Sequence, residues 1–489
     1  MPGNDYDVAI IGGGITGAAI ARDASLRGLK VLLCEKGDFA QGASSKSSKL
    51  IHGGLRYLEQ LDFALVKEAL EERSILINTL PLHVKWLPFL LPVYNEHKRP
   101  YWLIRLGLTL YDLFSHRAAP PYKPQTREAI LQRFPTLNPE GLKGGCLYYD
   151  AVMDDSRIVI ENLRSAKQLG ATILNYTTAA PFLSPEGQVQ GVIYNGQKAY
   201  AKQVIDASGA WSAEFQKEIA LTPTKGVHLV IPQVHQECAL TLEAPQDRRI
   251  FFLLPWNGST LLGTTETVYR GSLDDVKVEQ EDIAYLQEAY LHYFPNGSKE
   301  IYGAFAGVRP LVKDWHAAPF KVSRKPALHR SANGLLTIVG GKYTIYRKMA
   351  QDVVDQLTTV PCTTAVTPLY DLGDDLAPFA TTLGLDSATS AHLIQRYGSS
   401  ALKILQRIEK DHSQKEPFCP VHPFIKAEVS YAIEEEFVVK AEDWLLLRTK
   451  VGYHPIPTCR CAQFINDYLN QRKKNDDSTL SSRVTRSPC

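Results

Sequence analysis

Three glycines near the start of the chain have the spacing of a nucleotide-binding turn. Gly12, Gly14 and Gly17 form G-x-G-x-x-G directly after an apolar run at 8–11, and an alanine-rich stretch follows them. We expect Gly12 to form a tight turn, Gly14 to let the backbone approach a pyrophosphate, and Gly17 to let helix and strand pack closely. The N-terminus of that helix would present N–H groups and a partial positive charge to the phosphates. The motif therefore predicts a bound dinucleotide.

A glutamate stands at the end of the second apolar run. Glu35 follows a second apolar run at 31–34 and stands 18 residues after Gly17. A carboxylate at the end of the second strand accepts hydrogen bonds from ribose hydroxyls, and it would repel a 2′-phosphate. The ligand is therefore expected to be NAD or FAD rather than NADP. A glycine-rich turn without a ligand is the alternative, and the joint spacing of strand, glycines, helix and acid disfavours it.

Composition sets the broad class of the protein. The 489 residues are 44% hydrophobic and 22% charged, which is ordinary for a soluble protein. A chain of this length suggests roughly two to four domains. The formal net charge of +2 gives no indication of a nucleic-acid partner.

The cysteines indicate a compartment and bear on metal binding. Eight cysteines without a signal peptide predict a reducing, cytoplasmic environment. Cys459 and Cys461 form C-x-C without a second pair at zinc spacing, and His422 follows Cys419 without completing a set of four. We expect isolated thiols, and we predict no metal site.

Two aromatic-rich stretches raise the question of a membrane surface. No apolar run reaches the roughly 18 residues that would span a bilayer. Residues 86–94 and 101–114 come near this length, but prolines and Arg105 interrupt them, and Lys85, Lys98, Arg99 and Arg117 lie nearby. Apolar side chains flanked by cations suit a surface that lies on a membrane. Burial in a core is the alternative, and the sequence leaves both open.

The elements that must position the glycine motif come from separated parts of the chain. Helical patterns occupy 63–80, 154–169 and 342–357, while buried-strand patterns lead into glycines at 209 and 340–341. Strand-like runs with turn signals fill much of 171–275. Beyond 361 the apolar residues follow i, i+3, i+4 spacing, which predicts helices.

This interleaving predicts an α/β fold with three parts and a tail. A Rossmann-like nucleotide domain would be assembled from discontinuous segments, with a mostly antiparallel β domain inserted between them and a helical domain after them. The predicted boundaries are 1–80, 145–222 and 305–360 for the nucleotide domain; 81–144 and 223–304 for the substrate-binding β domain; 361–472 for the C-terminal helical domain; and 473–489 for a disordered tail.

One segment resembles a known family. GASSKSSKLIHGGLRYLE at 42–59, joined to the glycine motif upstream, is similar to the FAD-dependent glycerol-3-phosphate dehydrogenases of the D-amino-acid-oxidase-like flavoprotein superfamily. The likeness extends over nearly the whole chain, to about residue 470. Further similar segments follow in the family's order at 148–166, 206–211, 225–232, 254–267, 306–311, 340–350 and 432–452.

This resemblance implies a cofactor, a reaction and partners. The cofactor would be FAD, and the reaction would be oxidation of sn-glycerol 3-phosphate to dihydroxyacetone phosphate by hydride transfer, with electrons passed to a membrane quinone. The chain lacks the long insertion associated with the oxygen-using glycerophosphate oxidases, which favours the dehydrogenase. Peripheral association with the cytoplasmic face of the membrane is expected, and a homodimer is compatible with the sequence.

Three alternatives to this function remain open. The first is a glycerophosphate oxidase that delivers electrons to oxygen. The second is a flavin oxidoreductase acting on an amino acid or a 2-hydroxyacid, since an arginine also binds carboxylates. The third is a flavin-binding module without catalysis, against which the intact set of arginines and a histidine argues.

The resemblance assigns a clamp for the substrate phosphate. Arg56 and Arg324 would hold the dianion, aided by Tyr57 and Thr265. Arginine suits this task because its planar fork donates two bonds and keeps its charge near neutral pH. Arg309 would either join the clamp or polarise the C2 oxygen.

The proton acceptor for the C2 hydroxyl has two candidates. His228 lies between apolar residues and is the first, because a neutral imidazole accepts protons near physiological pH. A hydrogen-bonded core histidine is the alternative. His52 is a rival for the same role, although its position beside the serine-rich loop suggests contact with the cofactor. Lys342 would lie near the flavin or the substrate oxygen, where a cation stabilises the reduced ring.

The remaining predicted contacts hold the cofactor. The serine-rich loop offers hydroxyls and backbone donors to the pyrophosphate and flavin, with a flexible linker as the alternative, and Gly209 permits close backbone approach. The predicted cofactor-binding set is Gly12, Gly14, Gly17, Glu35, Ser44, Ser45, Ser48, His52, Gly209, Trp211, Lys342 and Thr344.

Overall fold

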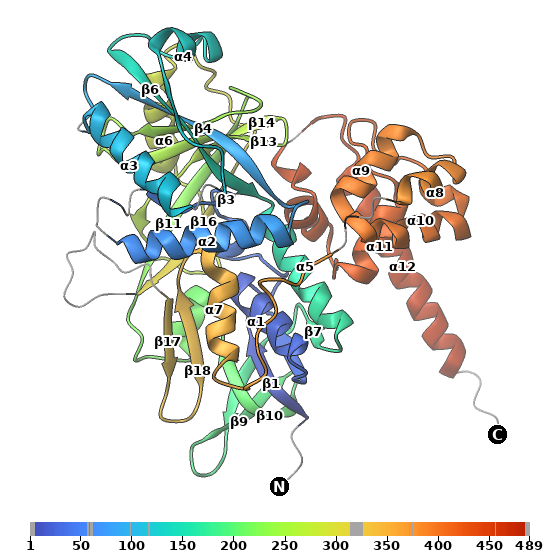
Figure 1. Ribbon diagram of the computed structural model, residues 1–489. Helices are drawn as coiled ribbons and strands as arrows, with labels where there is room; N and C mark the ends of the chain where they lie inside the picture. The colour runs from blue at the N-terminus through green and yellow to red at the C-terminus, as the bar shows by residue number, and fades with distance from the viewer. Residues whose placement is uncertain are drawn as a thin grey trace, which may run out of the picture. The chain divides into compact units, whose positions relative to one another are not determined.

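The computed structural model describes residues 5–55, 58, 62–97, 99–115, 118–312, 326–370, 372, 375–454 and 456–484. The chain divides into two compact units, Met1–Leu369 and Tyr370–Cys489, which are described separately below. The larger unit contains two sheets with helices packed on them, and the smaller unit contains helices (Figure 1). This confirms the predicted α/β class with a helical C-terminal part.

The first sheet has a parallel centre. Its order is β17-β18-β10-β1-β2-β7, and β17 is an antiparallel edge strand. The strands are β1 (Tyr6–Ile11), β2 (Val31–Cys34), β7 (Thr172–Leu174), β10 (Gln197–Asp206), β17 (Pro326–Arg330) and β18 (Leu336–Gly340). A hairpin of β8 (Ala179–Leu183) and β9 (Val189–Tyr194) extends from β10. The apolar runs of β1 and β2 are almost wholly buried, as a parallel sheet covered by helices requires.

Helices cover this sheet and bring separated segments together. α1 (Ile15–Leu26) packs against both α5 (Asp155–Gln168) and α7 (Tyr346–Val354), as Figure 1 shows around β1. Because β2, β1, β10 and β18 run parallel, the loops that follow them leave the sheet at the same edge. The glycine turn, Glu35, Gly209 and Lys342 all lie in these loops.

The second sheet is mostly antiparallel. Its order is β15-β11-β14-β13-β12-β4-β6-β3, with β16 paired to β11 and β5 paired to β6. The strands are β3 (Leu50–Ile51), β4 (Val84–Tyr94), β5 (Lys123–Gln125), β6 (Leu142–Met153), β11 (Leu221–Ile231), β12 (Ala239–Glu243), β13 (Ile250–Trp256), β14 (Ser259–Gly263), β15 (Thr267–Val268) and β16 (Gly303–Val312). α4 (Arg127–Arg133) and α6 (Gln280–Tyr293) contribute Ile130 and Leu286 to its apolar core.

Strand pairing shifts two segments relative to the predicted domain boundaries. Most of β16 falls in the range 305–360, which the sequence assigned to the nucleotide domain, yet the strand pairs with β11 along its whole length in the second sheet. Most of β6 likewise falls in the range 145–222, but it pairs with β4. Local sequence pattern marks these segments as strands, and only their hydrogen-bond partners assign them to a sheet.

The two aromatic-rich stretches differ in how far they are buried. Residues 86–94 lie within β4, whose Leu87, Phe89 and Leu90 are buried in the second sheet. Residues 101–114 form α3 (Tyr101–Phe114), which leaves Trp102 66% and Leu113 64% exposed. α2 (Phe63–Thr79) packs beside α3. None of the helices in the described ranges is both long and apolar enough to cross a bilayer.

The smaller unit is helical. Its helices are α8 (Leu376–Thr382), α9 (Ser387–Tyr397), α10 (Ala401–Lys410), α11 (Lys426–Glu435) and α12 (Cys461–Val484). One apolar cluster joins α8, α9 and α10 to the start of α11, and a second surrounds Trp444 and the start of α12. α12 extends beyond the end predicted at Arg472, so its backbone is helical through most of the range 473–489 that we had expected to be disordered.

Candidate active site

The glycine turn follows β1 and has the conformation that its spacing predicts. Gly12 has φ of +107°, a value that favours glycine, and a Cβ there would lie 2.7 Å from the carbonyl oxygen of Ala207. A Cβ on Gly17 would lie 2.0 Å from the Gly12 oxygen, so α1 can approach the turn only with glycine at this position. Gly14 is the N-cap residue of α1 and receives no side-chain capping bond.

Glu35 is attached to this turn by its own carboxylate. Its Oε2 accepts the N–H of Gly13 at 2.7 Å, and its Oε1 accepts the N–H of Gly37 at 2.9 Å. Burial raises the pKa of the Glu35 carboxyl, and these two N–H groups oppose the shift. A carboxylate oxygen can accept more than one hydrogen bond, so the group can hold the turn and still accept a ribose hydroxyl.

The serine-rich loop is anchored to the same turn. Ser44, in the 3₁₀ helix η1 (Ala43–Ser45), accepts the N–H of Ile15 at 2.9 Å through its Oγ. The Oγ of Ser45 is buried and has no hydrogen-bond partner among the described residues. The loop is therefore a structured neighbour of the α1 N-terminus, which argues against a flexible linker.

A buried ion pair fixes the end of this loop. Lys49 Nζ lies 2.7 Å from Asp155 Oδ2 and also donates to the Ser45 carbonyl at 2.6 Å. Ser47 donates to the same Asp155 oxygen at 2.7 Å. Both charged side chains are almost inaccessible to solvent, so neither charge would be tolerated without the other. The sequence showed Lys49 as part of the loop but gave no indication that Asp155 of α5 pairs with it.

His228 connects the loop to the second sheet. It lies on β11, it is 1% exposed, and its Nε2 is 2.9 Å from Ser48 Oγ. Its ring stacks on Phe305 of β16 with centroids 5.1 Å apart, because β11 and β16 pair these two positions. Sequence reasoning singled out His228 and Ser48 separately, and it missed Phe305.

The environment of His228 keeps the imidazole neutral. Burial lowers its pKa well below the usual value, and the positive charges of Arg309 and Lys49 lower it further. Its Nδ1 is buried and accepts or donates no hydrogen bond within the described part of the chain. Among the described residues, only one of its two ring nitrogens is therefore hydrogen-bonded.

Arg309 lies on β16 close to the same histidine. Its Nη2 donates to Thr264 Oγ1 at 3.1 Å, and the guanidinium is half-buried. The sequence pointed to the neighbouring Thr265, whose Oγ1 accepts the N–H of Val227 at 3.0 Å within the sheet. Thr264 is thus the threonine in direct contact with the arginine.

The loop after β18 meets the loop after the serine-rich segment. Thr344 Oγ1 donates to the His52 carbonyl at 3.2 Å and accepts the His52 N–H at 3.3 Å. Lys342 is half-buried and precedes the 3₁₀ helix η4 (Tyr343–Ile345) at the carboxyl end of β18. The structure therefore brings His52 and Thr344 together, beside the position of Lys342.

The loop after β10 contributes an open surface. Gly209 has φ of +65°, and a Cβ on it would meet no atom within 4 Å. Trp211 donates through Nε1 to Asp274 at 3.0 Å, and Lys36 Nζ lies 4.3 Å from its ring centroid. The Trp211 ring is also 3.4 Å from the Cβ position of Gly42, which links it to the serine-rich loop.

A further lysine near the site was missed. Burial lowers the pKa of the Lys46 ammonium group to about 8, although the Asp155 carboxylate opposes this. Its side chain packs against Gly307 of β16, where a Cβ would be only 2.5 Å from Lys46 Cβ. Its place between the serines of the loop was the available signal. The predicted clamp residues Arg56, Tyr57 and Arg324 lie outside the described residues.

Comparison with known proteins adds the family. The profile of the FAD-dependent oxidoreductases matches residues 7–347, and that of the C-terminal domain of alpha-glycerophosphate oxidase matches residues 335–479. The chain belongs to the FAD-dependent oxidoreductases. Aerobic glycerol-3-phosphate dehydrogenase of Bacillus subtilis is 34% identical, over 99% of this chain and 94% of that protein. The corresponding protein of Staphylococcus haemolyticus is 36% identical, over 93% and 88%.

Solved structures agree with this assignment. Glycerol-3-phosphate dehydrogenase of Bacillus halodurans, solved as a complex with FAD, matches with a TM-score of 0.74 and 27% identity, over 99% of this chain and 91% of that one. Glycine oxidase of Geobacillus kaustophilus shares the fold, with a TM-score of 0.57 and 21% identity over 73% of this chain and 97% of that one.

The residues present fit the FAD of this oxidoreductase family. Gly14 brings no side chain to the α1 N-terminus, where Ser44 binds the N–H of Ile15; the hydroxyl of Ser45 is buried without a partner among the described residues, and the space over Gly209 is open. All three lie in or beside loops that leave the parallel sheet at one edge. A pyrophosphate at the helix N-terminus and a ribose at Glu35 would use these groups. The predicted cofactor is confirmed as FAD.

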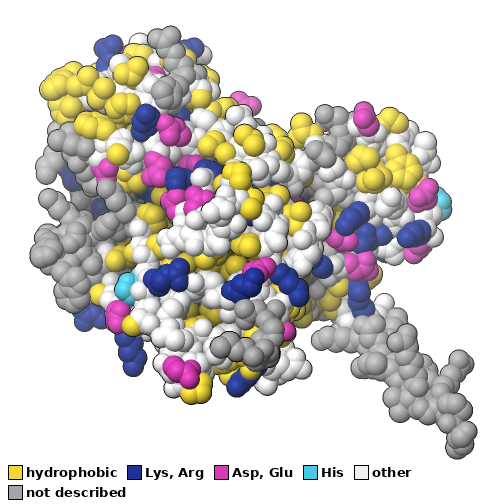
Figure 2. Space-filling view, turned by 60° about the horizontal axis from the view of Figure 1, so that its bottom comes forward, with side chains coloured by type: hydrophobic (Ala, Val, Ile, Leu, Met, Phe, Trp, Pro, Cys, Tyr) yellow, Lys and Arg dark blue, Asp and Glu magenta, His cyan; other side chains and the backbone are white. Residues whose placement is uncertain are grey.

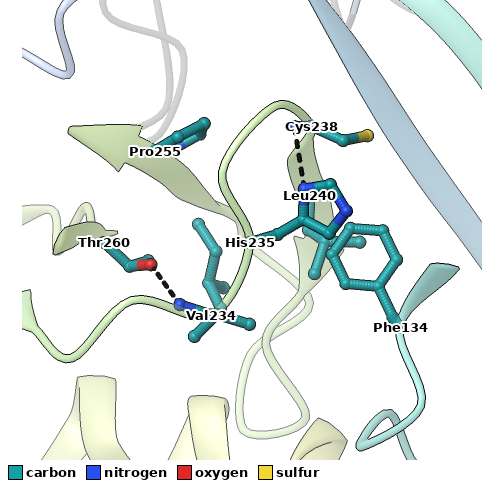
Figure 3. Close-up of a pocket in the computed structure, with 8 residues that line it drawn as sticks. Phe134, Val234, His235, Cys238, Leu240, Pro255 and Thr260 are labelled. Carbon is teal, nitrogen blue, oxygen red and sulfur yellow. Dashed lines mark hydrogen bonds between the residues drawn. The ribbon is translucent and has the colours of Figure 1, made fainter. Parts of the chain in front are cut away.

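A recess elsewhere on the second sheet is separate from these groups. It is lined by Phe134, Val234, His235, Cys238, Leu240, Leu253, Pro255 and Thr260 (Figure 3). Two of the polar groups drawn there are already paired: His235 Nδ1 accepts the N–H of Cys238, and Thr260 Oγ1 accepts that of Val234. The recess shares no residue with the candidate active site.

Proposed function

We propose that the chain oxidises sn-glycerol 3-phosphate to dihydroxyacetone phosphate and passes the electrons to a membrane quinone. The observation that carries this proposal is the contact between Ser48 and His228, 2.9 Å long, which joins the predicted FAD loop to a buried histidine. The names of the relatives from Bacillus subtilis and Staphylococcus haemolyticus support the choice of substrate.

His228 is the proton acceptor in this proposal. If Nε2–H donates to Ser48 Oγ, Nδ1 carries the lone pair, and that atom is buried without a partner among the described residues. The lowered pKa keeps the ring unprotonated at neutral pH, so Nδ1 is ready to take the proton of the C2 hydroxyl. When bound, FAD supplies the acceptor for the hydride from C2.

Positively charged side chains stabilise negative charge on the substrate and the flavin in this proposal. Arg309 is held by Thr264 and stabilises negative charge that develops on the C2 oxygen as its proton leaves. Lys342, at the end of β18, is assigned to the flavin side of the site. Arg56 and Arg324, with Tyr57 and Thr265, remain the predicted phosphate clamp. Every group named here comes from one chain, so the proposal needs no second copy, and light scattering would test the predicted homodimer.

A second candidate is an oxidase that reduces oxygen. It is favoured by one specific observation, the match of residues 335–479 to the C-terminal domain of alpha-glycerophosphate oxidase. Both candidates share the substrate and the first half-reaction and differ only in the electron acceptor.

Anaerobic flavin reduction tests the shared half-reaction. Glycerol 3-phosphate added to the FAD-loaded protein should bleach the flavin absorbance within the mixing experiment, whereas glycine and 2-hydroxyglutarate should not. A soluble quinone analogue should then restore the colour faster than air-saturated buffer. Bleaching by glycine alone would exclude the proposed substrate, and rapid peroxide formation in air would favour the oxidase.

The exposed face of α3 supports contact with a membrane. Trp102, Leu106 and Leu113 share one face and are 66%, 49% and 64% exposed, and Arg105 lies beside them. In the space-filling view, hydrophobic side chains gather toward the upper left, while Lys or Arg and Asp or Glu are interspersed elsewhere on that face (Figure 2).

Vesicle sedimentation tests this contact. The double variant Trp102→Ser, Leu113→Ser should pellet less with vesicles containing anionic lipid and keep its activity with a soluble dye. The control Val366→Ser removes a side chain that is 80% exposed outside α3, and it should pellet like the unaltered protein. Equal pelleting of all three proteins would remove α3 from the proposal.

A further inference from the structure

Three cysteines from distant parts of the sequence meet in the smaller unit. The sulfur atoms of Cys419, Cys459 and Cys461 all lie within 4.8 Å of one another. Cys419 and Cys461 are buried, and Cys459 is half-buried. No other group of three candidate metal ligands of this compactness occurs in the described ranges, so the remaining described cysteines form no such cluster.

We propose that these three thiolates and His422 bind a zinc ion. Three cysteines and one histidine are an established ligand set for structural zinc. Ligands at about 2.3 Å from a tetrahedral ion place two sulfurs roughly 3.8 Å apart, and Cys419 Sγ is 3.8 Å from Cys459 Sγ. A disulfide would need about 2.05 Å, so the cluster has the spacing of ligands around an ion.

His422 is the candidate for the fourth position for two reasons, although its ring nitrogens are not part of the compact set formed by the three sulfur atoms. It follows Cys419 by three positions, and C-x-x-H places both side chains on one turn of chain. Its Nε2 is buried, and no described residue forms a hydrogen bond with it. A buried imidazole nitrogen without a partner is costly unless something is bound there, and a zinc ion satisfies it.

The position of the cluster indicates a structural role. Cys461 is the first residue of α12, and Cys419 precedes α11, so an ion would join the two helices across the apolar cluster around Trp444. Beside it, Phe418 stacks on Phe464 of α12 with centroids 4.3 Å apart. This role is independent of the flavin site, which lies in the larger unit.

Metal content tests the proposal on the full chain. Protein purified from zinc-containing medium, with FAD bound, should contain about one zinc per chain by elemental mass spectrometry. Cobalt exchanged into the site should give the strong visible bands of tetrahedral cobalt and a thiolate charge-transfer band. Cys461→Ser should lose both signals. The control Cys362→Ser alters a half-buried cysteine of the larger unit and should keep them.

Two further outcomes would overturn the proposal. The first is the same zinc content in Cys461→Ser as in the control. The second is a zinc-free protein in which mass spectrometry finds Cys419 and Cys459 joined as a disulfide. Retained FAD absorbance and helical circular dichroism in Cys461→Ser would show that loss of metal does not merely reflect unfolding.

The fourth ligand has its own matched pair of variants. His422→Gln should weaken cobalt binding and shift the visible bands, because a nitrogen ligand is replaced. His454→Gln changes a half-buried imidazole that interacts electrostatically with His422, and its bands should be unaltered. A shift in His454→Gln alone would overturn the assignment of His422.

Discussion

The two sheets of the larger unit contribute to the active site in different ways. At the edge of the parallel sheet, the candidate site consists mainly of backbone: the Gly12 turn, the N-terminus of α1 at Gly14 and the open turn at Gly209. On the antiparallel sheet, it consists of side chains, chiefly His228 and Arg309, held in position by the pairing of β11 with β16. In the proposed function, one region binds the cofactor by shape and partial charge, and the other performs the proton transfer.

This difference predicts how each region responds to amino-acid substitution. A backbone site depends on space, so an added side chain should abolish cofactor binding without touching the catalytic groups. A side-chain site depends on functional groups, so their removal should leave the cofactor in place. The loop of Ser44, Ser48 and Lys49 belongs to both regions, because it holds α1 at one end and His228 near the other.

The largest expected effect is loss of the flavin. In Gly14→Val the branched side chain would occupy the space that the pyrophosphate needs, while its Cβ meets only Ser44 Oγ at 3.0 Å. The variant should fold and be colourless, as measured by FAD absorbance and circular dichroism. Gly107→Ala on α3, where a Cβ meets no atom within 4 Å, is the control. Full FAD occupancy in Gly14→Val would contradict the assignment of the glycine turn to cofactor binding.

Removal of the proposed proton acceptor should leave the flavin bound and slow the chemistry. We expect His228→Ala to reduce the rate of flavin reduction by roughly 10²- to 10⁴-fold, since general base catalysis contributes that much. Stopped-flow absorbance under anaerobic conditions measures this rate. His235→Ala, a histidine of the separate recess, should react normally. A normal rate in His228→Ala would transfer the role to another group such as His52.

Breaking the ion pair between Lys49 of the serine-rich loop and Asp155 should destabilise the folded protein. Asp155→Asn leaves the buried Lys49 ammonium without its partner and should lower the free energy of unfolding by about 3–5 kcal/mol. Chemical denaturation of the FAD-free protein measures the change. For comparison, Glu71→Gln breaks an ion pair with Lys67 whose side chains are 51% and 56% exposed, which is worth only about 0.3–0.5 kcal/mol.

The contact between the two regions should have a smaller effect. Ser48→Ala removes one hydrogen bond to His228 and should slow flavin reduction roughly tenfold, because a single bond contributes about 1–1.5 kcal/mol. FAD occupancy should be unchanged, since Ser44 still holds the loop. A change in occupancy without a change in rate would place Ser48 with the cofactor rather than with the base.

The pH dependence of stability gives the smallest and most specific signal. The pKa of His228 is lower in the folded chain than the value of about 6.5 expected after unfolding. The unfolded state then binds the extra proton, so this histidine costs stability as the pH falls below about 6.5. The unaltered protein should lose up to roughly 1.4 kcal/mol per pH unit relative to His228→Phe. Parallel curves would mean that His228 is not a buried neutral group.

The sequence by itself determined the features that depend on neighbouring residues. The φ of +107° at Gly12 and the close approach at Gly17 are local requirements, and the spacing of the glycines in the sequence predicts them. The same holds for Glu35, which follows its strand directly, and for the helices after residue 370, whose apolar periodicity is a property of each segment. Local steric requirements and amphipathic periodicity can both be recognised from the order of the residues.

Tertiary structure alone decided the features that join distant segments. The sequence cannot show that Asp155 pairs with Lys49, that Phe305 stacks on His228, or that 86–94 is mostly buried while α3 leaves Trp102 and Leu113 exposed. It also led us to expect isolated thiols, although folding brings Cys419 beside Cys459 and Cys461. These contacts follow from strand register and helix packing, which depend on the free energy of the whole fold rather than on any local pattern.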